Sequence, residues 1–132
     1  MTIAEDIRAS KRTFIIGNGG SYANACHMAN DLFSVGVRAM VLDPATLTMV
    51  ANDFGYEFIF SKWLMQCAEA GDTLIALSGS GTSPNIVNAV EAAKLIGMRI
   101  HLITDYLKTR DMQQSEEDQI VLAHRLMREL RA

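Results

Sequence analysis

Four short apolar runs along the chain, each bounded by Gly, Asp, Ser or a basic residue, are typical of buried β-strands. They span residues 13–17, 38–43, 73–78 and 99–105. Between and after them, apolar residues recur every three or four positions, which is the spacing of amphipathic helices. This second pattern predicts helices over residues 22–34, 44–70, 84–96 and 115–131.

Strands that alternate with helices predict crossover connections and therefore a parallel sheet. The fold class expected is α/β, a doubly wound parallel sheet with helices on both faces. No internal repeat, low-complexity tract or long linker divides the 132 residues, so we expect a single domain over residues 1–132.

The composition narrows the function classes. With 49% hydrophobic and 20% charged residues the chain is typical of a globular protein. No segment approaches the roughly 18 unbroken apolar residues that a membrane span needs. The N-terminus also lacks the basic and apolar blocks of a secretory signal, so we expect a cytoplasmic protein without a membrane partner.

The net charge of −3 and the pI near 5.5 disfavour a nucleic-acid partner, because a duplex-binding surface is normally basic. Cys26 and Cys67 lie inside apolar helical patterns. Both are expected to be reduced and buried in the core.

Two polar loops follow the first and third predicted strands. Residues 17–21 read GNGGS and residues 78–85 read SGSGTSPN. Glycines let the backbone approach an anion, hydroxyls donate to it, and the next helix directs free N–H groups to the same place. In the second loop Ser83 suits the N-cap and Pro84 the first helical position. One such loop alone could be ordinary turn chemistry, but two at strand ends favour a ligand site.

Familiar nucleotide motifs are absent. A Rossmann fingerprint would need a glycine at Tyr22, and the Gly-Lys-Ser/Thr of a Walker loop occurs nowhere. The Gly-x-Ser-x-Gly of a hydrolase elbow is missing as well. Serines and threonines without a lysine suit a small phosphomonoester, and we expect a sugar phosphate.

Four motifs in order carry a family resemblance: GNGGSYANACHMANDL, VANDFGYEFIFSKW, GDTLIALSGSGTSPNIVNAVEAAKLIGMRIHLITD and EEDQIVLAHRLMREL. Together they resemble the sugar-isomerase (SIS) domain family, and within it most closely the phosphoheptose (sedoheptulose 7-phosphate) isomerases. The resemblance spans residues 14–130. It implies a flavodoxin-like strand order and a homo-oligomer, a tetramer or a dimer, with sites formed between subunits.

The resemblance also implies roles for individual residues. The second loop would bind the substrate phosphate through Ser78, Gly79, Ser80, Thr82 and Ser83. The sugar would lie against Asn18, Gly19, Gly20 and Ser21, with its hydroxyls near Asn52 and Asp53. The catalytic or zinc-binding set of the family matches His27, Asp31, Glu116 and His124.

The chemistry gives an independent reason for such a set. Converting a ketose to an aldose moves a proton between neighbouring carbons through an enediolate, which needs a base, a proton donor and a group that holds negative charge. His27 and Asp31, four residues apart, share a helix face and could bind one metal or one pair of hydroxyls. Glu116 and His124 lie about 80° apart on an ideal helix, so their pairing rests on the resemblance. Without zinc, we expect Asp31 to be the base and His124 the acid.

Taken singly, each histidine also has a structural interpretation. His27 could be a hydrogen-bonded helix residue and His124 a half-buried residue on an amphipathic helix, but the combination favours a site. His101, within the fourth predicted strand, is expected to be structural.

The chain departs from the family pattern at four of these positions. Asp31 replaces a glutamate and withdraws the carboxylate by one methylene, and Glu116 replaces a glutamine. Val35 stands where an arginine is common, and Gly79 replaces a threonine. Compared with the family, the chain is also shortened at the N-terminus, with about ten residues before the first strand, and before the last helix, where a fifth strand is expected.

Two functions stay open at this point. The first is an isomerase that converts sedoheptulose 7-phosphate, or a similar ketose phosphate, to an aldoheptose phosphate. The second is a non-catalytic SIS module that binds a sugar phosphate or a protein, as replication-initiator-associated relatives do. His27 and His124 favour the first, whereas the exchanges at Asp31 and Glu116 favour the second.

Overall fold

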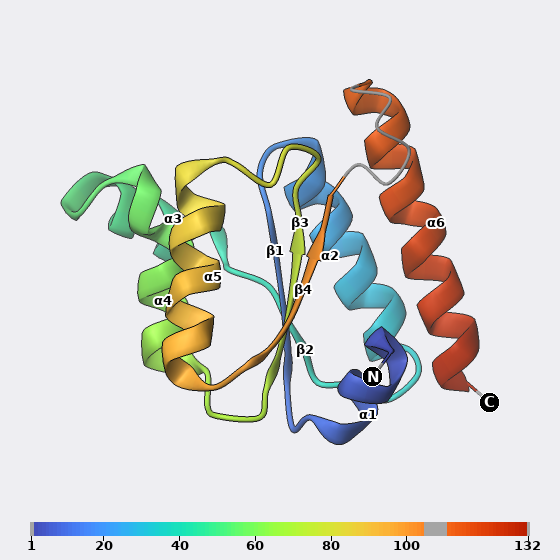
Figure 1. Cartoon of the computed structure of the whole chain (residues 1–132). Coiled ribbons are helices and arrows are strands. Elements are labelled where there is room, and N and C mark those ends of the chain that lie inside the picture. The colour runs from blue at the N-terminus through green and yellow to red at the C-terminus, as the bar shows by residue number, and fades with distance from the viewer. Residues whose placement is uncertain (1, 105–110, 132) are drawn as a thin grey trace.

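The computed structural model of the chain describes residues 2–104 and 111–131. Its sheet has four parallel strands in the order β2-β1-β3-β4 (Figure 1). They are β1 (Thr13–Gly17), β2 (Ala39–Met40), β3 (Thr73–Leu77) and β4 (Arg99–Ile103). The order reverses direction between β1 and β3, which confirms the doubly wound sheet with a flavodoxin-like order.

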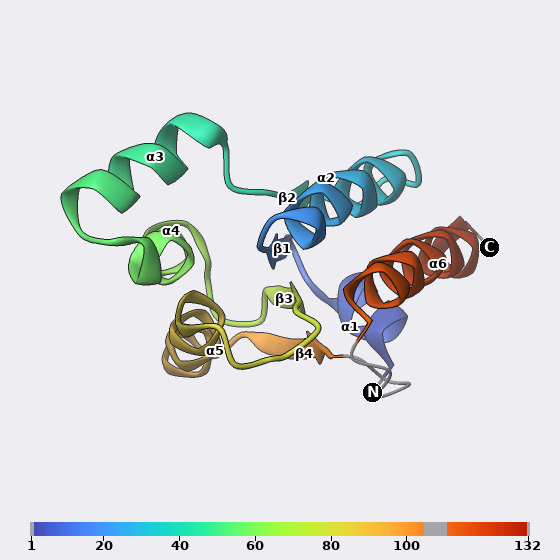
Figure 2. The ribbon, with the colours of Figure 1, turned by 90° about the horizontal axis from the view of Figure 1, so that it is seen from above.

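Helices cover both faces of the sheet, as predicted (Figure 2). One face carries α3 (Pro44–Asp53), the 3₁₀ turn η1 (Tyr56–Phe58), α4 (Ile59–Cys67) and α5 (Pro84–Ile96). The other face carries α1 (Ile3–Ala9), α2 (Gly20–Phe33) and α6 (Met112–Arg131).

Alternation along the strands divides the core in two. Phe14 and Ile16 of β1 point to the α4–α5 face, whereas Ile15 points to the α2–α6 face. All three are almost fully buried, so each face of the sheet is sealed by its own helices. The second core includes Leu126 of α6, which ties the last helix to the sheet.

The single helix predicted over residues 44–70 was wrong. α3 ends at Asp53, and the chain turns at Gly55, whose φ of 122° is a conformation that side-chain-bearing residues rarely adopt. The 3₁₀ turn and α4 then follow, and α4 ends at Cys67.

Other boundaries differ less. The strand predicted over residues 38–43 is only two residues long, because β2 is an edge strand that pairs with β1 at Thr13 and Phe14 alone. The sequence pattern did not predict α1, which begins with a capping box between Thr2 and Glu5. Asp105, the last residue of the fourth predicted strand, lies outside the described residues.

Both cysteines are free thiols, but neither is buried in the core. Cys26 is half-buried and Cys67, at the end of α4, is exposed, which corrects the prediction of two core residues. The structural interpretation of His101 is confirmed, because its Nε2 lies 2.6 Å from Asp6 of α1. Within residues 2–104 and 111–131, no helix combines the length and the apolar character needed to cross a membrane.

Candidate active site

The two polar loops lie side by side at the carboxyl end of the two central strands. β1 and β3 are direct neighbours, and their last residues, Gly17 and Leu77, are paired in register. The loop of residues 18–21, loop 1, and the loop of residues 78–83, loop 2, therefore leave the sheet together at its carboxyl end (Figure 1). This is where open parallel sheets bind ligands.

A reciprocal amide pair joins loop 1 to the second residue of α5, the helix that follows loop 2. Asn18 Nδ2 donates to Asn85 Oδ1 at 2.9 Å, and Asn85 Nδ2 donates to Asn18 Oδ1 at 2.8 Å. The Tyr56 hydroxyl of η1 also donates to Asn18 Oδ1, at 3.1 Å. These residues, with Glu57, Ser83 and Pro84, line a cleft of about 560 Å³. Asn85, Tyr56 and Glu57 were not predicted as site residues, and only the break at Gly55 could have drawn attention to η1.

Loop 2 is held by its own serines. The buried Ser78 accepts from the Gly81 N–H at 3.0 Å, and Ser80 accepts from the Thr82 N–H at 3.2 Å. Ser83 takes the predicted N-cap position of α5, but its side chain makes no capping hydrogen bond within the described chain. Its hydroxyl and the Asn85 N–H can therefore bind an anion, because Pro84 has no N–H and the N–H groups of Ile86 and Val87 donate to the Ser83 carbonyl at 3.0 Å.

Gly79 lies tight against the last helix. A Cβ at this position would be 3.1 Å from Ser115 Oγ of α6. A larger residue would require the Ser115 or Met112 side chain to move by a few tenths of an ångström.

Loop 1 is fixed to α6 through a polar network. Gln119 Nε2 donates to the buried Ser21 Oγ at 3.0 Å. Asn24 Nδ2 of α2 in turn donates to Gln119 Oε1 at 2.8 Å and to the Glu116 carbonyl at 2.9 Å. Neither Gln119 nor Asn24 was predicted, although a buried Gln at 3% exposure facing a loop serine is a strong structural signal.

Glu116 places its carboxylate against Gly20, at the start of α2. A Cβ on Gly20 would clash with the Glu116 carboxylate, so a larger residue here would force that flexible side chain to move. The negative charge is favourably placed at a helix N-terminus. Loop 1 thus already has an anionic group beside it, whereas the serines of loop 2 make no hydrogen bond with an acidic side chain among the described residues.

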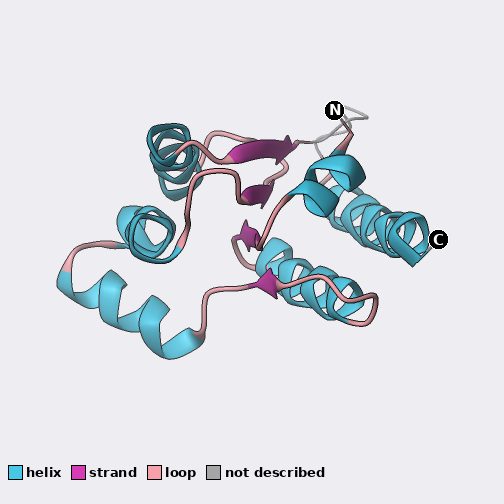
Figure 3. Ribbon diagram, turned by 90° about the horizontal axis from the view of Figure 1, so that it is seen from below, coloured by secondary structure: helices cyan, strands magenta, loops and turns pink. Residues whose placement is uncertain are grey.

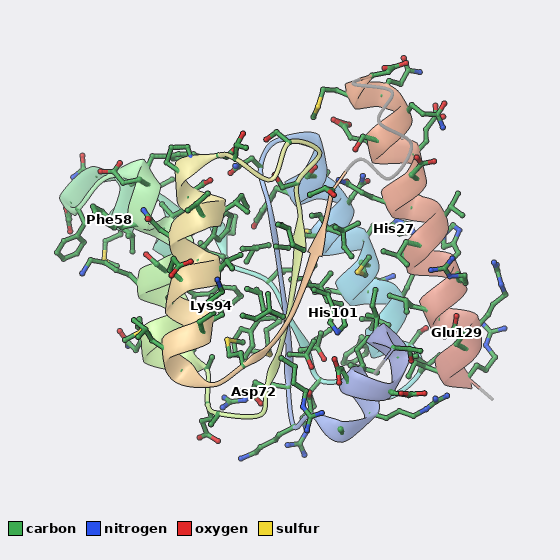
Figure 4. The ribbon with its side chains drawn as sticks, viewed as in Figure 1. His27, Phe58, Asp72, Lys94, His101 and Glu129 are labelled. Carbon is green, nitrogen blue, oxygen red and sulfur yellow. The ribbon has the colours of Figure 1, made fainter. Side chains whose placement is uncertain are left out.

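His27, Asp31 and His124 converge between α2 and α6. The two Nε2 atoms are 3.2 Å apart, and they lie 3.2 Å and 3.7 Å from Asp31 Oδ2. His27 can be followed between the two helices in Figure 4. Asp31 is 9% exposed, and its Oδ2 makes no hydrogen bond of acceptable geometry despite the two close imidazoles.

This arrangement fits a metal ion. One ligand atom from each of the three residues lies within 4.8 Å of the others. Ligand bonds of 2.0–2.2 Å at tetrahedral angles place ligand atoms about 3.3 Å apart, close to the observed spacing. A cation would also satisfy the unpartnered Asp31 oxygen. Glu116, the fourth residue of the expected set, does not belong to this cluster in the described residues.

Asn52 and Asp53 lie at the end of α3 and are exposed. Asn52 Nδ2 donates to Asp53 Oδ1 at 3.1 Å. No hydrogen bond given for the described residues links them to either loop, so any role in binding needs a ligand to join them.

A family model described as SIS domain matches residues 1–105 of the chain. The chain belongs to the SIS domain family. Its matches include the phosphoheptose isomerases of Sodalis glossinidius and Photorhabdus laumondii, each 38% identical over 109 residues. These alignments cover 77% of this SIS domain chain and 56% of each relative, so the chain spans little more than half of their length.

Solved structures agree on the fold. Phosphoheptose isomerase GmhA from Neisseria gonorrhoeae has a TM-score of 0.86 at 27% identity, with 97% of this chain and 80% of that chain covered. A phosphoheptose isomerase from Francisella tularensis has the same TM-score at 24% identity, over 96% of this chain and 81% of its own. The SIS domain therefore retains the fold of these proteins.

Proposed function

We propose that this SIS domain is an aldose–ketose isomerase that converts sedoheptulose 7-phosphate, or a similar ketose phosphate, to an aldoheptose phosphate. The observation that carries the proposal is the convergence of His27, Asp31 and His124 between two helices that flank loop 1. The names of the matched relatives support it, because they are phosphoheptose isomerases. The matched relatives do not favour the rival, a non-catalytic module.

The substrate phosphate would bind at loop 2. Ser80, Ser83 and the Asn85 N–H would be the donors, and Ser78 holds the loop in shape through Gly81. Gly79 and Thr82 complete this loop. Loop 1 is the weaker phosphate site because the Glu116 carboxylate beside Gly20 repels a second anion.

The sugar would extend from loop 2 along the cleft toward loop 1. Asn18 is already oriented by Asn85 and Tyr56, so it can exchange hydrogen bonds with sugar hydroxyls at little cost in side-chain entropy. The remaining contacts proposed in loop 1 are those of Gly19, Gly20 and Ser21. Asn52 and Asp53 would meet the far hydroxyls.

Without zinc, the chain's own residues would supply the proton transfer. Asp31 Oδ2 is buried and has no hydrogen-bond donor among the described residues, and we assign it the role of accepting the proton from the substrate carbon. His124, whose Nε2 faces it at 3.7 Å, can donate a proton to the substrate oxygen. His27 Nε2 lies 3.2 Å from the same Asp31 oxygen and would help to hold the carboxylate in place.

We propose zinc as the cofactor of this site, held by His27, Asp31 and His124. Glu116 would not ligate the ion, because its carboxylate lies beside Gly20 of loop 1. A bound zinc ion would polarise the substrate carbonyl and hold the negative charge that develops on it.

A direct assay tests the isomerase. Purified protein is mixed with sedoheptulose 7-phosphate, with added zinc or with a chelator, and aldoheptose phosphate is followed by NMR. We expect turnover that falls at least about a hundredfold in Asp31→Asn and in His124→Ala. Arg125→Gln, an exposed change on α6, is the control and should keep its activity. If the unaltered protein turns over no faster than His124→Ala, the domain is not an isomerase.

We further propose that the protein is cytoplasmic and works as a homo-oligomer, a tetramer or a dimer. Large exposed hydrophobic side chains on α3, the following turn and α4, among them Met49, Phe54 and Met65, support a subunit contact there. Light scattering coupled to size exclusion would show a mass above that of one chain; a monomeric mass at assay concentrations would contradict this.

A further inference from the structure

A second polar cavity lies at the opposite end of the sheet, where the strands begin. It has a volume of about 290 Å³ and lies among α1, the start of β1, the turn of residues 35–38 and the end of α6. Figure 3, which views the molecule from below, shows these segments on one side of the sheet. The carboxyl-end loops do not contribute to it, so it is separate from the proposed isomerase site.

Three basic side chains line this cavity without an acidic partner. Arg8, Lys11 and Arg38 are exposed, and none forms an ion pair with a carboxylate in residues 2–104 or 111–131. The acids of this end of the molecule are engaged elsewhere: Asp6 pairs with Arg99 and His101, and Asp72 with Arg12. In a chain with a net charge of −3, three uncompensated cations around one cavity form a local anion-attracting field.

A buried hydroxyl completes the donor set. Thr13 lines the cavity, is only 1% exposed, and its Oγ1 has no hydrogen-bond partner in the described structure. Its side chain points to the same face as Ile15, which is the face of α1 and α6 where the cavity lies. By contrast, Ser10 beside it is fully used by the Asp6 carbonyl and Thr73. An unpaired buried hydroxyl is costly, and a ligand oxygen would satisfy it.

We propose that this cavity is a binding site for a phosphate group. Arg8, Lys11 and Arg38 neutralise its charge, and Thr13 Oγ1 donates to one of its oxygens. Arg8 can take part because its donation to the Glu129 carbonyl, at 2.7 Å, occupies only one of the five N–H groups of the guanidinium. The volume is ample for inorganic phosphate or a small phosphomonoester.

The test isolates this site from loop 2. Inorganic phosphate and, separately, glycerol 3-phosphate are titrated by calorimetry into a Ser80→Ala/Ser83→Ala protein at low salt. We expect one remaining site per chain. Binding of both ligands identifies the phosphate group itself as the ligand, and tighter binding of one indicates whether the free or the esterified form is the natural source.

Variants then assign the site to its residues. Lys11→Gln/Arg38→Gln in the same background should weaken binding at least about tenfold, since two charge-assisted contacts are lost. Thr13→Val should weaken it severalfold while the folded signal in circular dichroism is kept, because removal of an unpaired hydroxyl leaves no orphan group. Lys62→Gln/Arg125→Gln removes the same charge elsewhere and should leave binding unchanged.

Two outcomes would overturn the proposal. One is an absence of phosphate binding once loop 2 has been disabled. The other is an equal loss of binding in Lys11→Gln/Arg38→Gln and in Lys62→Gln/Arg125→Gln, which would mean that only the net charge attracts the anion. Neither outcome depends on isomerase activity, so failure here is distinguishable from failure of the proposed function.

Discussion

At the scale of single residues, the candidate site is organised by buried amides rather than by the residues that would do chemistry. Asn85 is only 2% exposed, yet its whole side-chain amide is matched by Asn18. Gln119, at 3% exposed, is similarly matched by Ser21 and Asn24. These pairs fix loop 1 against loop 2 and against α6, because a buried amide that loses its partner is costly.

The Asn18–Asn85 pair gives a stability prediction. We expect Asn85→Ala to lower the free energy of unfolding by about 1–3 kcal/mol, because Asn18 loses a donor and an acceptor at a partly buried position. Urea unfolding measures it, with Asn30→Ala on the exposed side of α2 as the control. In the double variant Asn18→Ala/Asn85→Ala the loss should be less than the sum of the two single losses. Additive losses would mean that the two amides are not coupled.

At the scale of elements, α1 is held to the sheet edge by Asp6. Its carboxylate contacts His101 Nε2 at 2.6 Å and Arg99 at 3.2 Å, both on β4. Burial raises the pKa of Asp6, but the hydrogen bonds and positive charge of His101 and Arg99 together outweigh burial and hold the pKa below its usual value.

This direction sets the pH dependence. A carboxyl whose pKa is lower in the folded state contributes stability that is fully present above its unfolded pKa, about 3.9, and is lost as the pH falls through the folded value. We therefore expect the stability difference between the unaltered protein and Asp6→Asn to shrink as the pH falls below about 4. Urea unfolding from pH 3 to 7 measures this, with Glu117→Gln, exposed on α6, as the control. A difference that does not change with pH would contradict the assignment.

The break between α3 and α4 is the other element-scale feature that carries a prediction. Gly55 has a φ of 122°, and a Cβ there would be 2.9 Å from the Glu57 carboxylate. We expect Gly55→Ala to destabilise the protein by about 1–3 kcal/mol through backbone strain, and to weaken sugar-phosphate binding because Tyr56 is displaced from Asn18. Gly71→Ala also strains a positive φ, of 88°, but meets no atom within 4 Å. It should cost stability without affecting binding, and an equal loss of binding in both variants would remove the role given to η1.

At the scale of the whole molecule, the sequence predicts the sheet and its helix layers well, but it does not predict which residues of different elements come into contact. The sequence predicts buried strands such as β1 and β3 because both of their faces are apolar. It also predicts the ends of α5, because Pro84 begins the helix and Gly97 follows its last residue. The α3–α4 break was missed because helical periodicity continues across Gly55.

The site follows the same division. Loop glycines and serines are local signals, and they were found. The position of Glu116 was not predicted, because the eight-residue spacing to His124 does not indicate which part of α2 each residue contacts. Helix α6 contacts α2 along its length, so Glu116 reaches Gly20 while His124, two turns further on, reaches His27. That offset is a property of the packed helices and not of either sequence segment.

The same offset leads to the prediction that tests the molecule as a whole. Zinc that binds only the folded state stabilises it by about 2.7 kcal/mol at a concentration one hundred times the dissociation constant, and so should raise the melting temperature by several degrees. We expect this rise to vanish in His124→Ala and in Asp31→Asn, because the ligands come from α6 and α2 together. Glu116→Gln should keep the full rise, since Glu116 lies over Gly20 and outside the cluster.

Thermal unfolding with and without zinc measures the unaltered protein and the three variants. Leu126→Ala, which removes buried core volume beneath α6, is the control for destabilisation alone. It should melt at a lower temperature and still respond to zinc. If Glu116→Gln loses the zinc response as His124→Ala does, the metal site includes the fourth residue, and α6 must be arranged differently when the ion is bound.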